Sequence, residues 1–134
     1  MRKQFVSVLA VLAAVALWWV TQHGGTTEAP TPSSQTGTDP VSGLAWIAEA
    51  DLPPEAHDTL ELIDAGGPFP HDEDDETFGN FEGLLPDHER GYYREYTVET
   101  PGLDHRGARR IVTGSAGEYY WTQDHYASFE RIAR

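Results

Sequence analysis

The chain of 134 residues contains no cysteine and a single lysine. The absence of cysteine excludes disulfides, iron–sulfur clusters and thiolate zinc sites. A small exported domain of this composition must therefore fold on its apolar core alone, because covalent cross-links are not available to it.

Positive charge is also scarce. Nine lysines and arginines stand against 22 acidic residues, which gives a net charge of −13. Residues 41–134 hold seven arginines and twenty acids, so they carry all of this negative charge. Such a surface repels nucleic acid. However, Arg106, Arg109 and Arg110 fall within five residues, so a local positive site can exist on an acidic body.

The longest apolar run lies near the start of the chain, from Phe5 to Val20, after Arg2 and Lys3. As a helix of about 1.5 Å per residue, it would span about 24 Å, short of the roughly 30 Å of a bilayer core. The pattern therefore indicates a signal peptide, and not a transmembrane helix, for residues 1–23. No clean cleavage motif follows and two tryptophans end the run, so a retained membrane anchor and a buried helix stay open.

Residues 24–40 are rich in Thr, Ser, Pro and Gly and nearly free of apolar side chains. Such a segment buries too little surface to fold, so it is predicted to be a flexible linker. The folded domain is then expected over residues 41–134. Together the segments predict a secreted, extracellular protein, or one held at the membrane if its first segment is retained.

A helix is expected to open the domain. Asp51 is a candidate capping acid, and Pro53 and Pro54 suit the first turn of the helix. Ala56, Leu60 and Ile63 are spaced for one buried face, and Gly66-Gly67 is expected to end the helix.

Loops and strands are expected after this helix. Residues 68–86 are predicted to form a loop, and its acidic run, residues 72–76, is expected to be solvated because it lacks the spacing and central glycine of a calcium loop. The expected strand-like stretches are residues 92–98, 109–113, 119–122 and 126–132. One helix followed by strands predicts an α+β fold, with one main N-terminal helix packed on an antiparallel β-sheet.

Four polar residues are candidates for chemistry. Glu95 lies in mid-strand among tyrosines, where it either faces a groove or is an ordinary solvated or ion-paired glutamate. Arg106 and Arg110 suit a shared phosphate, although neutralising an acidic domain is the plainer alternative. His125 lies in a polar turn and can serve as a general acid, although a lone histidine usually has no such role.

The order and spacing of these residues resemble the guanyl-specific microbial ribonucleases, in particular their barnase-like bacterial branch. The matching segments, in family order, are LPPEAHDTLELI, GGPFPHD, FGNFEGLLP, GYYREYTVETPG, RGARRIVTG and DHYASFERI. The resemblance implies the microbial ribonuclease fold and an endoribonuclease that acts on single-stranded RNA.

The resemblance also implies a reaction and a role for each candidate. Glu95 would take the proton of the ribose 2′-hydroxyl, and His125 would protonate the departing 5′-oxygen. Arg106 and Arg110 would stabilise the charge on the phosphoryl oxygens, so no metal and no cofactor are expected. The product would be a 2′,3′-cyclic phosphate, and DNA would be excluded because it lacks the nucleophile.

Guanine recognition is implied for one segment and one aromatic residue outside it. The residues implied for substrate binding are Phe78, Gly79, Asn80, Phe81, Glu82 and Tyr126. Backbone groups of the loop would meet the O6 edge of guanine, while Glu82 accepts from its N1 and N2 hydrogens. Phe78 and Tyr126 are candidates to stack on the base or to flank it.

The chain departs from the family at two points. Members typically carry a disulfide whose first position is Ala48 here, and close relatives have an arginine in place of Phe81. The family also implies a monomer, with an inhibitor of the barstar kind as a candidate partner. Two alternatives stay open: a catalytically silent, tethered module that binds RNA or a partner on the same fold, and an acidic cation-binding surface protein.

Overall fold

The computed structural model describes residues 37–134, so the predicted segment 1–23 and most of the predicted linker lie outside the described residues. Its elements in chain order are β1 (Trp46–Ala48), the 3-10 turn η1 (Glu49–Asp51), α2 (Pro54–Ala65), β2 (Glu76–Thr77), β3 (Tyr93–Thr97), β4 (Arg110–Gly114), β5 (Tyr119–Thr122) and β6 (Glu130–Ala133). In this part of the chain, no helix is long and apolar enough to cross a membrane.

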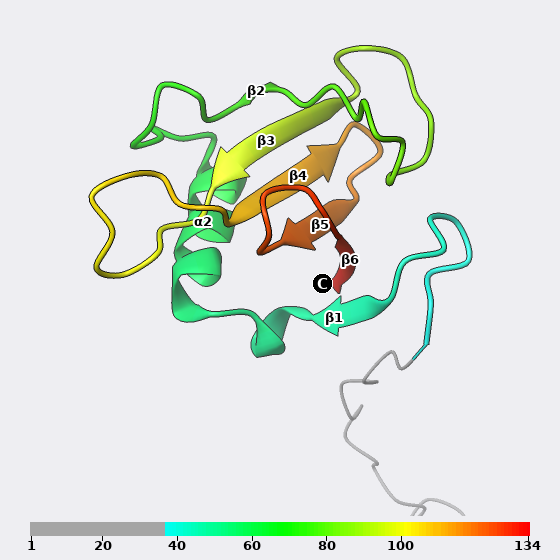
Figure 1. The fold of residues 1–134 in the computed structure, drawn as a ribbon, viewed down its shortest axis with the longest axis horizontal. Helices are drawn as coiled ribbons and strands as arrows, with labels where there is room; N and C mark the ends of the chain where they lie inside the picture. The colour runs from blue at the N-terminus through cyan, green and yellow to red at the C-terminus, as the bar shows by residue number, and fades with distance from the viewer. Residues whose placement is uncertain (1–36) are drawn as a thin grey trace, which may run out of the picture. The chain divides into compact units, whose positions relative to one another are not determined.

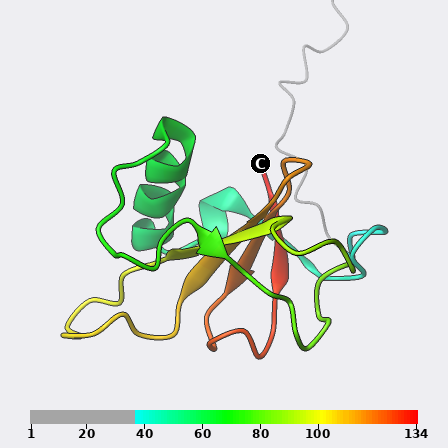
Figure 2. The same cartoon turned by 90° about the horizontal axis from the view of Figure 1, so that it is seen from above.

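The strands form one sheet in the order β1-β6-β5-β4-β3-β2, and α2 packs on one side of it (Figures 1 and 2). The predicted α+β fold is confirmed. The sheet is not wholly antiparallel, because β1 pairs with β6 in parallel, with Ile47 opposite Ile132. Parallel neighbours require a long crossover, which here comprises the helix and the other four strands.

The start of α2 differs from the prediction. Its N-cap is Pro53 and no side chain caps it, so Asp51 is not the capping residue. Asp51 instead ends the preceding 3-10 turn. Pro54 has no N–H, so the first helical residue needs no capping acceptor. The predicted end is confirmed: Gly66 adopts a left-handed φ of 77° and Gly67 donates its N–H to Leu62, as in a Schellman ending.

Each face of the sheet has its own apolar cluster. The cluster on the α2 side contains Leu52, Ala56, Leu60, Val98, Ile111, Trp121 and Ile132. The cluster on the opposite face contains Leu85, Tyr93, Val112, Tyr120 and Phe129. Because side chains alternate along a strand, Glu95 and Thr97 share the face of Tyr93. The polar candidates of β3 therefore lie on the face that loops cover.

The acidic run was expected to be solvated, but two of its carboxylates make hydrogen bonds to residues of β3. Asp74 accepts the backbone N–H of Thr97 at 2.7 Å, and Asp75 accepts the hydroxyl of Tyr96 at 2.9 Å. The predicted loop also contains β2, which pairs with β3. These contacts fasten the loop to the end of β3, because two carboxylates supply acceptors to groups that the sheet leaves free.

The folded domain begins before the expected boundary. Thr38 forms a bridge with Ala45, and Asp39 is only 3% exposed. Asp39 pairs with Arg131 at 3.1 Å. Burial raises the pKa of Asp39, but hydrogen bonds from Ser42 and from backbone N–H groups outweigh burial and leave the pKa lowered. Residues assigned to the linker thus belong to the domain.

Candidate active site

Glu95 projects from the middle of β3, on the face opposite α2, and its side chain is 15% exposed. Its Oε2 accepts a 2.7 Å hydrogen bond from the hydroxyl of Tyr126. Its Oε1 lies 3.6 Å from Nη2 of Arg106. Burial, followed by the bond to Glu95, raises the pKa of the Tyr126 hydroxyl. That hydroxyl therefore remains a donor, and the carboxylate is held between a neutral donor and a positive charge.

Thr97 brings the two candidate arginines together. Arg106 comes from the loop after β3 and donates its Nε to Oγ1 of Thr97 at 3.1 Å. Arg110 opens β4 directly opposite Thr97 and is only 2% exposed. The two arginines thus meet at Thr97 by different routes, one from a loop and one from a strand. Sequence reasoning missed Thr97, although alternation places it on the face of Glu95.

Both arginines keep a donor unused. Within residues 37–134, Nη2 of Arg106 and Nε of Arg110 are buried and have no hydrogen-bond partner. A buried donor on a charged group is costly to leave unpaired. Arginine pairs well with phosphate, whose oxygens supply several acceptors at once. The arrangement therefore suits an anion beside Glu95.

Glu73 is a second acid near this group that sequence reasoning missed. It lies in the acidic run, and its Oε2 is 3.6 Å from Nε of Arg106. Its side chain is 47% exposed, whereas that of Glu95 is 15% exposed. No sequence signal separates Glu73 from its acidic neighbours. The more enclosed Glu95 is better placed to act on a bound group.

His125 and Tyr126 occupy the tight turn between β5 and β6, with positive φ values of 54° and 69°. Two successive left-handed residues other than glycine are uncommon and cost free energy. Contacts with Asp124 offset that cost: it accepts the hydroxyl of Thr122 and the backbone N–H of Ser128, each at 2.9 Å. The hydrogen bond from the Ser128 side chain lowers the pKa of Asp124.

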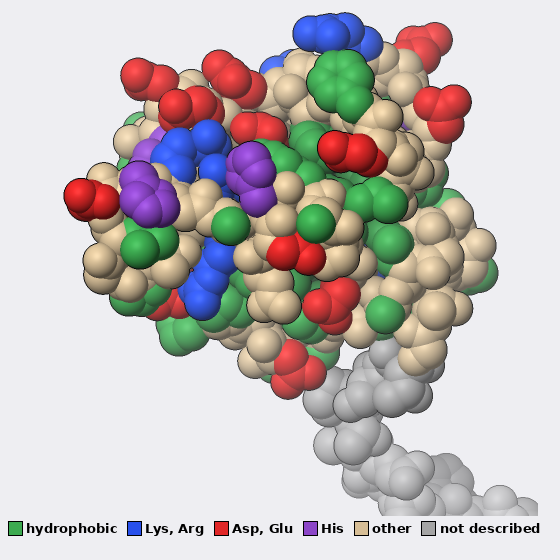
Figure 3. Space-filling view, viewed as in Figure 1, with side chains coloured by type: hydrophobic (Ala, Val, Ile, Leu, Met, Phe, Trp, Pro, Cys, Tyr) green, Lys and Arg blue, Asp and Glu red, His purple; other side chains and the backbone are tan. Residues whose placement is uncertain are grey.

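The same turn is fastened to the arginine loop. The backbone N–H of His125 donates to the carbonyl of Ala108 at 3.0 Å, two residues before Arg110. The imidazole itself is exposed. Figure 3 shows arginine and histidine side chains gathered on one part of this face, with acidic side chains around them. The fold thus places an exposed histidine beside the loop that carries the arginines.

The predicted base-reading loop is closed by its own asparagine. The side chain of Asn80 donates to the carbonyl of Leu85 at 2.9 Å and accepts its N–H at 3.1 Å. Asn80 has a φ of 51°. A Cβ on Gly79 would overlap the ring of Phe81, which is 88% exposed. Glu82 is exposed as well, so the loop presents a backbone edge and a carboxylate to solvent.

Phe78 and Tyr126 stack on each other, with centroids 5.0 Å apart and an interplanar angle of 28°. A base cannot enter between rings this close, so of the two expected arrangements the pair suits stacking on a base from one side. The pair offers one aromatic surface next to Glu95, because Tyr126 contacts both its ring partner and the carboxylate.

In the described part of the chain, no group of three or more histidine or acidic side chains is arranged to hold a metal ion. Glu95 instead has a positively charged partner, Arg106.

Comparisons with known proteins agree with this fold. The family model for ribonucleases matches residues 34–133. Guanyl-specific ribonuclease St of Saccharopolyspora erythraea is 60% identical over 89 residues, which cover 66% of this chain and 88% of that protein. Guanyl-specific ribonuclease Sa of Kitasatospora aureofaciens is 57% identical over 93 residues, which cover 69% of this chain and 95% of that protein. A solved structure of ribonuclease Sa2 in complex with mononucleotides aligns with a TM-score of 0.67 and 49% identity, covering 68% of this chain and 95% of that chain. The chain therefore belongs to the microbial guanyl-specific ribonuclease family.

Proposed function

We propose that this protein is an endoribonuclease that cleaves single-stranded RNA on the 3′ side of guanine, through a 2′,3′-cyclic phosphate and without a metal ion. Its relatives are named guanyl-specific ribonucleases, and related solved structures contain guanosine-2′-cyclophosphate and a 2′,3′-cyclophosphorothioate. The observation that carries the proposal is the buried Nη2 of Arg106, which makes no hydrogen bond and lies 3.6 Å from the Glu95 carboxylate.

In the first step Glu95 removes the proton of the 2′-hydroxyl, and the 2′-oxygen attacks the adjacent phosphorus. Negative charge builds on the phosphoryl oxygens as the new bond forms. Arg106 and Arg110 stabilise this charge, and preorganised donors of this kind are often the largest single contribution to catalysis. Arginine remains charged at any working pH, so these two residues supply positive charge throughout the reaction.

Departure of the 5′-oxygen completes this step. His125 gives its proton to that oxygen as the P–O bond breaks, which leaves a cyclic phosphate on the guanosine. Hydrolysis reverses the roles: His125 takes a proton from water, and Glu95 returns one to the 2′-oxygen. The product is a 3′-phosphate, and both residues regain their starting protonation. The exposed position of His125 suits a leaving nucleoside that must depart into solvent.

Guanine selection falls to the loop that Asn80 closes. The backbone around Gly79 and Phe81 faces the O6 edge, and Glu82 accepts from the N1 and N2 hydrogens. Adenine lacks this pair of donors, so the carboxylate would lose its hydrogen bonds against adenine.

We also propose that residues 1–23 direct export or hold the protein at a membrane, and that the segment after them is a linker. The support is the positive start and the apolar run. Sequencing the N-terminus of the protein released by the producing cell would test the proposal: a start between residues 20 and 37 supports cleavage, and an intact Met1 opposes it.

The proposed activity is tested by incubating the full chain with a defined single-stranded RNA in EDTA and mapping the cut sites and end groups. We expect cuts after guanine that leave cyclic or 3′-phosphate ends. Loss of activity on chelation would overturn the metal-free mechanism, and cuts spread over all four bases would overturn the specificity. RNA binding without any cleavage would favour the silent binding module. A matched RNA with 2′-deoxyguanosine at the cut site is the control, because it lacks the nucleophile.

A further inference from the structure

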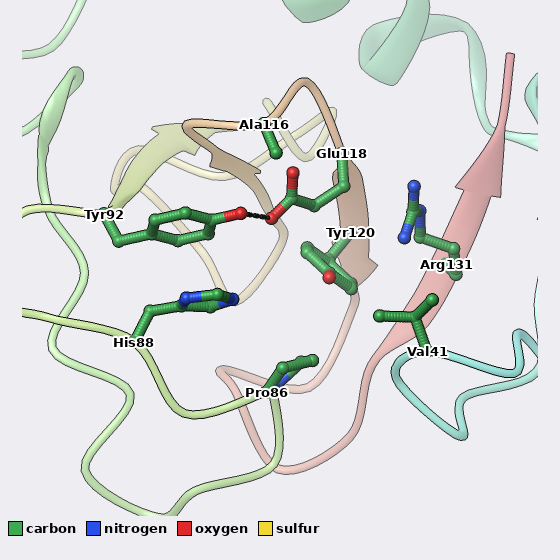
Figure 4. A pocket seen from close by; sticks show the side chains of 8 residues that line it. All are labelled: Val41, Pro86, His88, Tyr92, Ala116, Glu118, Tyr120 and Arg131. Atoms are coloured by element: carbon green, nitrogen blue, oxygen red, sulfur yellow. Dashed lines mark hydrogen bonds between the residues drawn. The ribbon is translucent and has the colours of Figure 1, made fainter.

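A pocket of about 300 Å³ lies on the same face of the sheet as Glu95, apart from the proposed active site. Most of its lining residues come from the loop before β3, from the turn between β4 and β5, from β5 and from β6. The lining residues used below are Pro86, His88, Tyr92, Glu118, Tyr120 and Arg131 (Figure 4). None of them belongs to the proposed catalytic group.

The sheet register places this pocket relative to the catalytic group. Arg110 pairs with Thr97 at one end of β3, whereas Gly114 pairs with Tyr93 at the other end. A Cβ on Gly114 would overlap the carboxylate of Glu118, so this carboxylate lies over the second end. The pocket and the arginines therefore occupy opposite ends of one face.

The base-reading loop connects the two sites. The carbonyl of Pro86, at the rim of the pocket, accepts hydrogen bonds from the side chain of Asn80 at 3.4 Å and from the hydroxyl of Tyr93 at 2.7 Å. A nucleotide in the pocket would thus contact the end of the loop that reads guanine. The catalytic arginines lie toward the scissile phosphate, which joins guanosine to its 3′ neighbour, so the pocket is on the 5′ side of guanine.

Two stacked aromatic rings, of His88 and Tyr92, line one side of the pocket. The imidazole of His88 stacks on the ring of Tyr92, with centroids 3.7 Å apart and an interplanar angle of 11°. His88 is an exposed residue that lines the pocket, and its ring also meets that of Tyr93 edge-on, with centroids 5.8 Å apart. Figure 4 shows the face of His88 away from Tyr92 turned toward Pro86, across the pocket. An exposed aromatic ring that lines a pocket suits an unpaired base, since every base has a π-face.

A carboxylate, Glu118, and a guanidinium, Arg131, also line the pocket and do not pair with each other. Glu118 is 8% exposed, and its Oε1 accepts the hydroxyl of Tyr92 at 2.5 Å. Arg131, on the other side of the pocket, pairs with Asp39 at 3.1 Å and forms no ion pair with Glu118 (Figure 4). Every nucleobase presents a donor next to an acceptor, so a base can face a carboxylate and a guanidinium at once.

We propose that this pocket binds the nucleotide on the 5′ side of the guanine, with its base on His88 and its polar edge between Glu118 and Arg131. The inference rests on the proposed function, because it requires an RNA cut after guanine. Arg131 lies three strands away from Glu95 across the sheet: Glu95 pairs with Val112, Val112 with Tyr120, and Tyr120 with Arg131. That separation is about 14 Å at 4.7–4.9 Å per strand, so one chain of a few nucleotides reaches both sites.

The test compares three substrates of the full chain: the dinucleotide GpA, the trinucleotide ApGpA, and the same trinucleotide without the first base. We expect the unmodified protein to cleave ApGpA with a kcat/KM about tenfold above GpA, because stacking of one base is worth that much or more. The substrate without the base should show no such gain. His88→Ala should bring the ratio of ApGpA to GpA close to one.

The control is His57→Ala, a histidine on α2 at the opposite face, which should keep the tenfold ratio. An equal rate for GpA and ApGpA in the unmodified protein overturns the subsite, as does a full ratio in His88→Ala. A gain that persists without the base also overturns it, because charge alone would then be responsible. Failure to cleave GpA at all refutes the proposed function itself, and so the two failures are distinguishable.

Discussion

Replacing Tyr126 by phenylalanine removes one hydroxyl and keeps the ring that stacks on Phe78. The hydroxyl donates a 2.7 Å hydrogen bond to Glu95. A hydrogen bond to a charged group is worth about 1.5–3 kcal/mol. Because about 1.36 kcal/mol corresponds to a tenfold change in rate, loss of the bond should lower kcat/KM by roughly ten- to a hundredfold.

The sign follows from the direction of the bond. Tyr126 donates, so it holds the carboxylate of Glu95, which is the group proposed to accept a proton from the 2′-hydroxyl. The kcat/KM of Tyr126→Phe for GpA should therefore fall by this factor.

Tyr96→Phe is the matched control. It removes a hydroxyl that donates to Asp75 at 2.9 Å, a carboxylate outside the proposed site. Its kcat/KM for GpA should match that of the unmodified protein. If Tyr126→Phe also keeps the full kcat/KM, Glu95 is not the base of the reaction. If both variants lose activity equally, the effect is general and says nothing of the site.

Three further predictions concern other parts of the molecule. Glu82→Ala should lower the ratio of kcat/KM for GpA over ApA by about tenfold or more, with a smaller effect on the turnover of GpA, and an unchanged ratio would show that another group reads the base. His125→Gln should reduce turnover on RNA by roughly two to four decades, but much less on a substrate whose leaving group needs no proton; near-normal turnover on RNA would place the acid elsewhere. Asp39→Asn should lower the free energy of unfolding in urea by about 1–3 kcal/mol near pH 7, because the charged partner of Arg131 is lost. The folded pKa of Asp39 is lowered, so its contribution is present above the unfolded value of about 3.9 and is lost as pH falls through the folded value; the two proteins should converge in acid.

Local patterns predicted most of the fold. The spacing of Ala56, Leu60 and Ile63 predicted the buried face of α2, and the paired glycines predicted its end. Alternation also placed Glu95 on one face of β3. These features depend on near neighbours in the chain, so a single sequence contains them.

Long-range contacts were not predictable in the same way. The parallel pairing of β1 with β6 joins two short strands at opposite ends of the domain, and a three-residue strand has no clear pattern of its own. The same limit applies to the bond between Tyr126 and Glu95 and to the contact between Asp74 and Thr97, each of which joins a loop to a strand. Resemblance named the residue types at the site, but the hydrogen bond from Arg106 to Thr97 emerged only from the fold.

The parallel pair has a consequence for the order in which the protein is made. β1 is among the first elements to leave the ribosome, yet its strand partner β6 is synthesised after every other strand of the sheet. β1 therefore has no strand partner until β6 has emerged, and pairings between segments so far apart in the chain form slowly. The turn that carries His125 and Tyr126 is anchored between β5 and β6, so it also forms late. The proposed acid, His125, would thus join Glu95 and the two arginines only after β6 has paired with β1.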